Sequence, residues 1–182
     1  SMLVAQRLDL ALVSPADDLI VSVPRSLLLR TVEPVTLAEA LATGRAPWFY
    51  KSMVPKQLAA RVVPTIDALR TAAEGLEPST VLLASEPVRF AWEARVFVLH
   101  GQILDAAVYE GHAAGDLRVV LAGFVAELVA AVELPETCVV DVGYIPGEGL
   151  ALVEFNASWG AGLNGCRPER VVDAIAAATR LF

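Results

Sequence analysis

The stretch VVDVGYIPGEGLALVEFNAS, residues 139–158, predicts two apolar strands joined by a Pro-Gly-Glu-Gly turn. Each predicted strand carries one acid within its apolar run, Asp141 in the first and Glu154 in the second. Side chains alternate between the two faces of a strand, so Asn156 lies on the same face as Glu154. The pairing of the two strands therefore decides whether three oxygen-bearing side chains converge.

The length of the turn sets this pairing. With a four-residue loop over residues 146–149, Ile145 pairs with Leu150, and Asp141 then faces Glu154. Directly opposed residues have Cβ atoms about 4.5–5.5 Å apart, where like charges repel. A cation between the two carboxylates would keep both ionised, and an all-oxygen set of ligands suits Mg²⁺. A different register, with one acid in water, is the alternative that geometry leaves open.

Composition favours a compact fold of one domain or two small lobes. The chain has 182 residues, of which 55% are hydrophobic and only 19% are charged, and this composition argues against a disordered chain. The net charge of −7 argues against nucleic acid as a partner, although a few lysines with Mg²⁺ can still neutralise a nucleotide. No uninterrupted apolar run has the length needed to cross a membrane, so no membrane partner is expected.

The two cysteines and the first residues of the sequence predict a cytoplasmic location. Cys138 and Cys166 follow no metal-binding or redox spacing, which indicates buried thiols in a reducing compartment. Arg7 and Asp9 interrupt the first apolar stretch, so we do not expect a signal peptide.

The order of the predicted elements indicates an α+β fold, in which a small strand-and-helix lobe precedes a larger antiparallel sheet that carries helices. One helix is predicted by a capping box at Thr36 and Glu39 and by a stop at Gly44. A hairpin is predicted around His100 and Gly101. The predicted helices cover residues 4–12, 36–44, 63–75, 117–133 and 167–182, and the predicted strands cover 19–23, 26–32, 47–53, 79–88 and the two halves of 93–111.

A second polar cluster lies on the first strand of this hairpin, where Glu93 and Arg95 share one face. Two interpretations are open. The pair is either a structural ion pair, or Glu93 binds a hydroxyl-rich ligand while Arg95 grips a phosphate or a carboxylate with two hydrogen bonds. Lys51, at the end of a predicted strand, is either an ordinary surface lysine or a ligand contact. The small-residue loop at 156–165 either simply turns or lets backbone N–H groups approach an anion.

The order of these residues along the chain resembles the ATP-grasp superfamily. The resemblance rests on a lysine at a strand end, an acidic hinge in SEPV followed by a glutamate, then an aspartate, then an E-x-N motif before a glycine-containing loop. Within the superfamily, the sequence is most similar to the R-two-K clade through LLLRTV, FYKSMVPKQ, SEPVRFAWEARVFVLHG and AAVYEG, over roughly residues 27–182. Two features depart from many relatives: residues 53–60 lack a glycine-rich loop, and few residues precede Leu27 to form an acid-binding domain.

The resemblance implies an ATP-grasp fold of the α/β sandwich type, with two α+β lobes, a mainly antiparallel sheet in the C-terminal lobe, and a nucleotide between the lobes. Residues 1–29 would be a reduced N-terminal segment, residues 30–90 the N-lobe and residues 91–182 the C-lobe.

The resemblance also implies roles for individual residues. The positions that match the family's ATP contacts are Lys51, Lys56, Glu86, Pro87, Val88 and Glu93. The positions that match its ligands for Mg²⁺, or alternatively Mn²⁺, are Asp141, Glu154 and Asn156. Catalytic roles fall to Arg95 and Lys56, and the loop facing the substrate would contain Ser158, Gly160 and Gly162.

The activity implied by the resemblance is that of a ligase. Such an enzyme uses ATP and Mg²⁺ to join a carboxylate to an amine or a similar nucleophile through an acylphosphate. The sequence names neither partner, and amino acids and peptides are candidates for both. The alternative is a catalytically reduced module that binds ATP or another protein without turnover.

Overall fold

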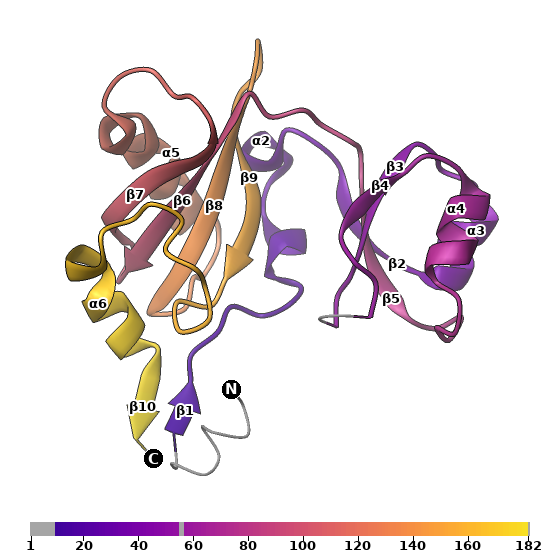
Figure 1. Cartoon of the computed structure of the whole chain (residues 1–182), viewed down its shortest axis with the longest axis horizontal. Helices are drawn as coiled ribbons and strands as arrows, with labels where there is room; N and C mark the ends of the chain where they lie inside the picture. Colours follow the sequence, from indigo (N-terminus) through magenta and orange to yellow (C-terminus); the bar gives the residue numbers. More distant parts are fainter. Residues whose placement is uncertain (1–9, 55–56, 182) are drawn as a thin grey trace.

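Two lobes are joined in this protein by the segment that leads from α2 to β2 and by the extended segment that leads from β5 to β6, as Figure 1 shows. The computed structural model describes residues 10–54 and 57–181. The smaller lobe contains a four-stranded antiparallel sheet in the order β2-β5-β3-β4 and two helices on the side away from the larger lobe. Its elements are β2 (Val32–Thr36), α3 (Leu37–Thr43), β3 (Trp48–Ser52), β4 (Arg61–Val63), α4 (Ile66–Ala72) and β5 (Val81–Ser85).

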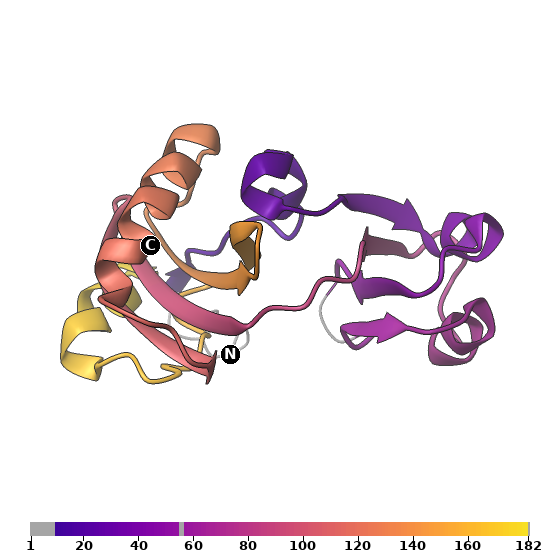
Figure 2. The same ribbon diagram turned by 90° about the horizontal axis from the view of Figure 1, so that it is seen from above.

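The larger lobe contains a second four-stranded antiparallel sheet, in the order β7-β6-β8-β9, with one helix on each face. Figure 2 shows α5 and α6 on opposite sides of this sheet. Alternate residues of β6 therefore enter two different cores: Val96 packs in the cluster that contains α5, and Phe97 packs in the cluster that contains α6. The elements are β6 (Trp92–Leu99), β7 (Gln102–Gly111), α5 (Leu117–Ala131), β8 (Thr137–Ile145), β9 (Gly149–Asn156) and α6 (Pro168–Ala177).

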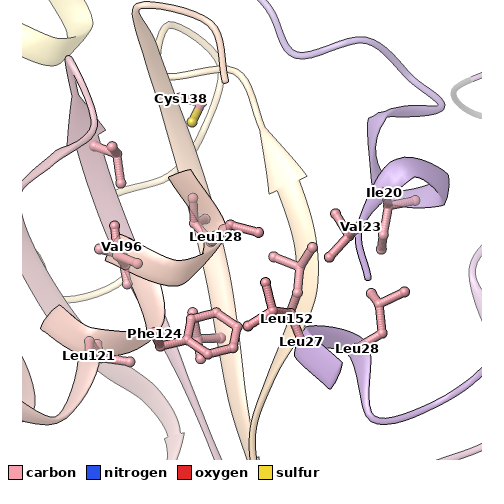
Figure 3. Close-up of a cluster of buried hydrophobic side chains, with 14 of the residues drawn as sticks. Ile20, Val23, Leu27, Leu28, Val96, Leu121, Phe124, Leu128, Cys138 and Leu152 are labelled. Atoms are coloured by element: carbon pink, nitrogen blue, oxygen red, sulfur yellow. The ribbon is translucent and has the colours of Figure 1, made fainter. Parts of the chain in front are cut away.

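The segment that precedes the smaller lobe packs against the larger one. Strand β1 (Leu10–Leu12) pairs with β10 (Thr179–Leu181), and η1 (Leu19–Ser22) and α2 (Arg25–Leu28) follow it. Figure 3 shows Ile20, Val23, Leu27 and Leu28 beside Leu152 of β9, and these side chains belong to one buried cluster. The N-terminal segment thus completes the hydrophobic core of the larger lobe.

The hairpin that contains the two acids confirms their predicted opposition, but by a different register. Ile145 pairs with Gly149, so the turn has three residues and the predicted pairing of Ile145 with Leu150 is wrong. A β-bulge between the pairs of Asp141 and Val142 then shifts the register by one residue and places Asp141 opposite Glu154. The turn is one residue shorter than predicted and the bulge adds one residue to β9, so Asp141 and Glu154 still face each other.

The α+β fold and most of the elements of both lobes are confirmed. The Thr36–Glu39 capping box forms as predicted, and Gly44 follows it in the left-handed conformation. The hairpin turn also lies at His100 and Gly101, both of which have positive φ. No helix within residues 10–54 and 57–181 combines the length and the apolar character that crossing a membrane requires.

Three predictions about the ends of the chain were wrong. Residues 19–23 contain the 3₁₀ helix η1 instead of a strand, and 26–32 divide into helix α2 and the start of β2, because Leu29 adopts a left-handed conformation between them. The last helix ends at Ala177 and is followed by strand β10. The helix predicted at residues 4–12 lies outside the described residues except for 10–12, which form strand β1.

Candidate functional site

Three charged side chains form a row across the larger sheet. Arg95 on β6 is paired in register with Asp141 on β8, which is paired in turn with Glu154 on β9. The alternation of a strand places all three on the face that carries α6, away from the core under α5. The site is therefore built by strand pairing, and each side chain enters it from a different strand.

Arg95 and Asp141 form a buried, two-pronged ion pair. The Arg95 Nε donates to Oδ1 of Asp141 at 2.9 Å, and Nη2 donates to Oδ2 at 2.6 Å. Asp141 is only 1% exposed and Arg95 is 8% exposed. Glu93 does not pair with Arg95, so the structural partner of Arg95 is an acid far away in the sequence.

Glu154 is held differently, by a lysine from the other lobe. The Nζ of Lys51, on β3, donates to Oε2 of Glu154 at 2.7 Å, and both side chains remain more than one third exposed. The Nδ2 of Asn156 donates to Glu154 at 2.9 Å and to Asp141 at 3.2 Å, which links the two acids. Asn156 therefore bridges the opposed carboxylates, and each carboxylate is paired with its own protein cation in this structure.

The pKa values of the two acids are shifted in opposite directions. Burial raises the pKa of Asp141 above its ordinary value, and the hydrogen bonds and charge of Arg95 reduce that rise without cancelling it. Burial also acts to raise the pKa of Glu154, but the charge and hydrogen bond of Lys51 outweigh burial and lower it. The cation paired with Asp141 thus does not offset the effect of burial on the pKa, because Asp141 loses almost all contact with water. For the more exposed Glu154, the effect of burial is outweighed.

A cavity of about 610 Å³ lies between the lobes and brings together most of the residues predicted for nucleotide binding. Its volume is within the range of small-molecule sites, about 300–1,000 Å³. The predicted residues on its wall are Lys51, Glu86, Pro87, Val88, Glu93, Glu154 and Asn156. Arg95 and Asp141 are not on the wall and lie behind Glu154 and Asn156 in the sheet. Lys56 lies outside the described residues.

Glu86 and Glu93 are already engaged at their ends of the cavity. The carboxylate of Glu86 accepts a 2.6 Å hydrogen bond from the backbone N–H of Thr31, which lowers its pKa, and it also faces Arg25 at 3.4 Å. The carboxylate of Glu93 accepts a 2.5 Å hydrogen bond from the Tyr109 hydroxyl, while burial raises its pKa. Glu86 therefore ties the hinge to the residue before β2, and residues 86–88 lie on the cavity wall.

The structure adds wall residues to which the sequence reasoning gave no role. Arg30 is 7% exposed, and it donates hydrogen bonds to the carbonyl oxygens of Leu28, Leu152 and Val153. Burial lowers its pKa to about 10, and no carboxylate of the described residues forms an ion pair with it. The signal available in the sequence was a charged residue, Arg30, directly after the apolar residues 27–29. The further wall residues include Phe49, Phe90, Phe155, Trp159 and residues 14–17.

None of the three predicted residues of the substrate loop lies on the cavity wall. This β9–α6 loop comprises residues 157–167, and Ser158 is buried in it, with its hydroxyl 2.8 Å from that of Thr137. The carbonyl oxygen of Gly162 accepts a 2.7 Å hydrogen bond from Nη1 of Arg95, and Gly160 forms a turn with Ala157. Ala157 and Trp159 are the loop residues on the cavity wall.

The oxygen atoms beside the cavity fit a hard divalent cation. Glu154 supplies a partly exposed carboxylate and Asn156 an amide, and Mg²⁺ is commonly held by one or two carboxylates together with phosphate oxygens and water. Asp141 fits less directly, because both of its oxygens accept hydrogen bonds from Arg95. Within the described residues, no three His, Cys, Asp or Glu side chains are grouped as a metal site.

Solved structures with similar folds are ATP-grasp proteins and ligases. A RimK domain protein from Sphaerobacter thermophilus matches with a TM-score of 0.55 and 19% identity, over 78% of this chain and 55% of that chain. The macrocyclase MdnC from Microcystis aeruginosa, bound with precursor peptide MdnA, matches with a TM-score of 0.56 and 18% identity, over 90% and 58%. The D-alanine–D-alanine ligase from Bacillus anthracis, complexed with ATP, matches with a TM-score of 0.57 and 12% identity, over 90% and 66%.

These likenesses show the ATP-grasp fold, and the chain spans only 55–66% of the length of these three structures. No curated protein matches the sequence. The family model described as ATP-grasp domain, R-two-K clade family 2, matches residues 27–174, which include the hinge, the row of charged residues and most of α6. The match covers well over half of the chain, and the protein therefore belongs to this family of ATP-grasp domains.

Proposed function

We propose that this protein is an ATP-dependent ligase that joins a carboxylate to an amine, or to a similar nucleophile, through an acylphosphate. The observation that carries the proposal is the cross-cavity pair of Lys51 and Glu154, 2.7 Å apart on walls that belong to different lobes. When this ion pair opens, the lysine can bind a nucleotide phosphate and the carboxylate can bind a divalent cation.

The nucleotide would lie along the cavity from the hinge to the E-x-N motif. The backbone of residues 86–88 would bind the adenine edge, and Glu93 would bind the ribose hydroxyls, since both lie on the cavity wall. Lys51 and Arg30 would neutralise the phosphates, since Arg30 donates hydrogen bonds only to carbonyl oxygens and still carries an unbalanced charge. We also propose a phosphate contact and a catalytic role for Lys56, on the family resemblance alone.

The reaction would proceed in two balanced steps. An oxygen of the substrate carboxylate attacks the γ-phosphorus, the bond from this phosphorus to the β–γ bridging oxygen breaks, and ADP leaves. The amine then attacks the acyl carbon, inorganic phosphate leaves, and the amine proton passes to solvent. Phosphoryl transfer needs positioning and charge neutralisation more than covalent help from the protein. The pocket between two lobes can also exclude water from the acylphosphate.

A bound Mg²⁺ or Mn²⁺ would supply charge neutralisation at the phosphate oxygens. Glu154 and Asn156 are the residues that would hold it, with Asp141 behind them as a third oxygen donor if its bonds with Arg95 loosen. Trp159 and the glycines Gly160 and Gly162 would border the acid substrate, and the buried hydroxyl of Ser158 would hold their loop. An amino acid or a peptide would suit a ligase of this kind as substrate.

Two wider proposals rest on the same reasoning. We retain the three-part division at residues 29/30 and 90/91, with the first part attached to the third by the core around Leu152. We also propose a cytoplasmic location, where the buried thiols of Cys138 and Cys166 would remain reduced.

The first test is a calorimetric titration of ATP with Mg²⁺ into the wild-type chain, Glu154→Ala and Glu148→Ala. Glu148 lies exposed at the turn of the same hairpin, so its variant has the same change of charge away from the cavity. We expect Mg²⁺-dependent binding to wild type and Glu148→Ala, and its loss in Glu154→Ala. Equal binding by all three proteins would contradict the proposed site.

The second test asks for the first chemical step alone. A candidate acid should promote the exchange of labelled ADP into ATP without any amine, because formation of the acylphosphate is reversible. Exchange with one acid of a panel of amino acids, dicarboxylic acids and peptides would support the ligase. ATP binding without exchange for any acid would favour a nucleotide-binding module that lacks turnover. Absence of ATP binding would favour a protein-interaction domain.

A further inference from the structure

All the nitrogen atoms of the Arg95 side chain are engaged inside the protein. Nε and Nη2 donate to the two oxygens of Asp141, and Nη1 donates to the carbonyl oxygen of Gly162 at 2.7 Å. The guanidinium also lies over the Tyr109 ring, with Cζ 5.8 Å from the ring centroid. Arg95 is 8% exposed and does not line the cavity. Each of the three nitrogen atoms therefore donates a hydrogen bond inside the protein, and the side chain lies away from the cavity wall.

These contacts join two parts of the site that no strand joins. Asp141 belongs to the row of acids in the sheet, whereas Gly162 belongs to the β9–α6 loop. Among the hydrogen bonds described for residues 159–165, only two come from outside this loop: that from Arg95 to Gly162, and that between Trp159 and Ser14. Arg95 therefore links the sheet to the middle of the loop at Gly162, while the hydroxyls of Ser158 and Thr137 link the sheet to the start of the loop.

We propose that Arg95 is a positioning residue, which holds Asp141 and the β9–α6 loop in a fixed relation and does not itself contact the transferred phosphoryl group. This role differs from the catalytic one implied by the family resemblance. Only the statement about the phosphoryl group rests on the proposed function. The planar fork of arginine is required, because it satisfies two carboxylate oxygens and a carbonyl oxygen in three directions at once. A lysine has a single nitrogen and keeps the charge without this geometry.

The test uses the three tryptophans of the chain as reporters. Protein labelled with 5-fluorotryptophan gives one fluorine resonance each for Trp48, Trp92 and Trp159, and a Trp159→Phe variant assigns the loop resonance. In nucleotide-free Arg95→Lys, we expect the Trp159 resonance to move or broaden while the other two keep their wild-type positions. Arg170→Lys is the matched control, because Arg170 pairs with Asp105 at the start of α6 without contacting Gly162. It should leave all three resonances in place.

A second variant guards against misfolding. Arg95→Met with Asp141→Leu removes both charges together, so that no unpaired ion is buried, yet it still deprives Gly162 of its donor. We expect the same displacement of the Trp159 resonance as in Arg95→Lys. Wild-type positions of the Trp159 resonance in both variants would overturn the proposal, because the loop would then be held by other contacts.

Nucleotide binding separates positioning from direct contact. ADP is titrated in the presence of EDTA, so that no metal ion links the nucleotide to Asp141. We expect the Kd for ADP in Arg95→Lys and Arg95→Met to stay within about twofold of wild type. A loss of about tenfold in Arg95→Met that Arg95→Lys restores would show a charge contact with phosphate and overturn the proposal. If wild type binds no ADP, the proposed function fails, while the fluorine experiment still decides the link between Arg95 and the loop.

Discussion

Asp141 and Glu154 face each other on neighbouring strands, and each is paired with one cation, but the two ion pairs differ in location and exposure. Asp141 is 1% exposed, and its partner Arg95 lies in the same sheet. The side chain of Glu154 is 36% exposed, and its partner Lys51 belongs to the other lobe. The first pair can be broken only by exposing a buried charge, whereas the second can be replaced by ligands from solvent. Of the two opposed acids, Asp141 thus belongs to the buried part of the sheet, whereas Glu154 belongs to the cavity wall.

The largest expected effect comes from removing the arginine of the buried pair. Arg95→Met would leave the Asp141 carboxylate buried without a charged partner, and such changes cost about 3–5 kcal/mol of folding free energy. Urea denaturation measures this loss. The variant that adds Asp141→Leu should recover most of it, since paired replacement of buried ions by apolar residues is often neutral. Equal losses in the single and double variants would show that the pair is not the cause.

Removing the lysine of the exposed pair should affect the ligand more than the fold. In Lys51→Met we expect a loss of folding free energy below about 1 kcal/mol, as is usual for exposed ion pairs. The affinity for Mg-ATP should fall about tenfold or more, which calorimetry measures. Lys51→Arg keeps the charge and should retain most of the affinity. A large loss of stability with unchanged affinity would reverse the roles assigned to the two pairs.

The pH dependence of folding should have opposite signs at the two acids. The raised pKa of Asp141 means that its stabilising contribution is present below its ordinary pKa of 3.8 and is lost as the pH rises through the folded-state value. The lowered pKa of Glu154 means that its contribution is present above 4.5 and is lost as the pH falls through the folded-state value.

Asp141→Asn and Glu154→Gln separate these contributions when denaturation is measured from pH about 3 to about 7. The stability advantage of wild type over Glu154→Gln should grow with rising pH. Its advantage over Asp141→Asn should shrink over the same range. Parallel changes for the two variants would contradict the difference in environment.

Salt should produce the smallest effect. At about 1 M ionic strength the screening length is about 3 Å, so the exposed pair of Lys51 and Glu154 should lose most of its fraction of a kcal/mol. The difference in stability between wild type and Lys51→Met should therefore vanish at high salt. The corresponding difference for Arg95→Lys should persist, because solvent ions do not reach a pair that is almost fully buried.

Local signals in the sequence predicted the elements whose stability is local. The Thr36–Glu39 capping box is satisfied by bonds within four residues, and the turn at His100 and Gly101 needs only positive φ values. The prediction of a strand at 26–32 was wrong because this segment depends on contacts distant in the sequence. Its apolar run suits a strand or a buried helix equally, and packing against Leu152 of β9 favours the helix.

The sequence predicted that Asp141, Glu154 and Asn156 lie together on the sheet, but it did not predict the partners of the two acids or the wall residue Arg30. The E-x-N motif and the opposed acid indicated Asp141, Glu154 and Asn156, yet the bulge beside Asp141 has no signature in the sequence. The partner of each acid depends on long-range geometry: Arg95 precedes Asp141 by 46 residues, and Lys51 precedes Glu154 by 103. Such contacts arise from the order of strands and from the approach of the lobes, which one sequence does not encode locally.

The pairing of the first and last described strands has a consequence for rearranging the chain. Residues 10–12 are hydrogen-bonded beside 179–181, so a short linker could connect these two strands without crossing either lobe. New ends could open at Gly115, which is exposed and has only open space on the side where a Cβ atom would lie. Such a circular permutant would preserve every strand pairing while changing the order in which they form. The cavity wall at residues 14–17 would then lie in the middle of the polypeptide.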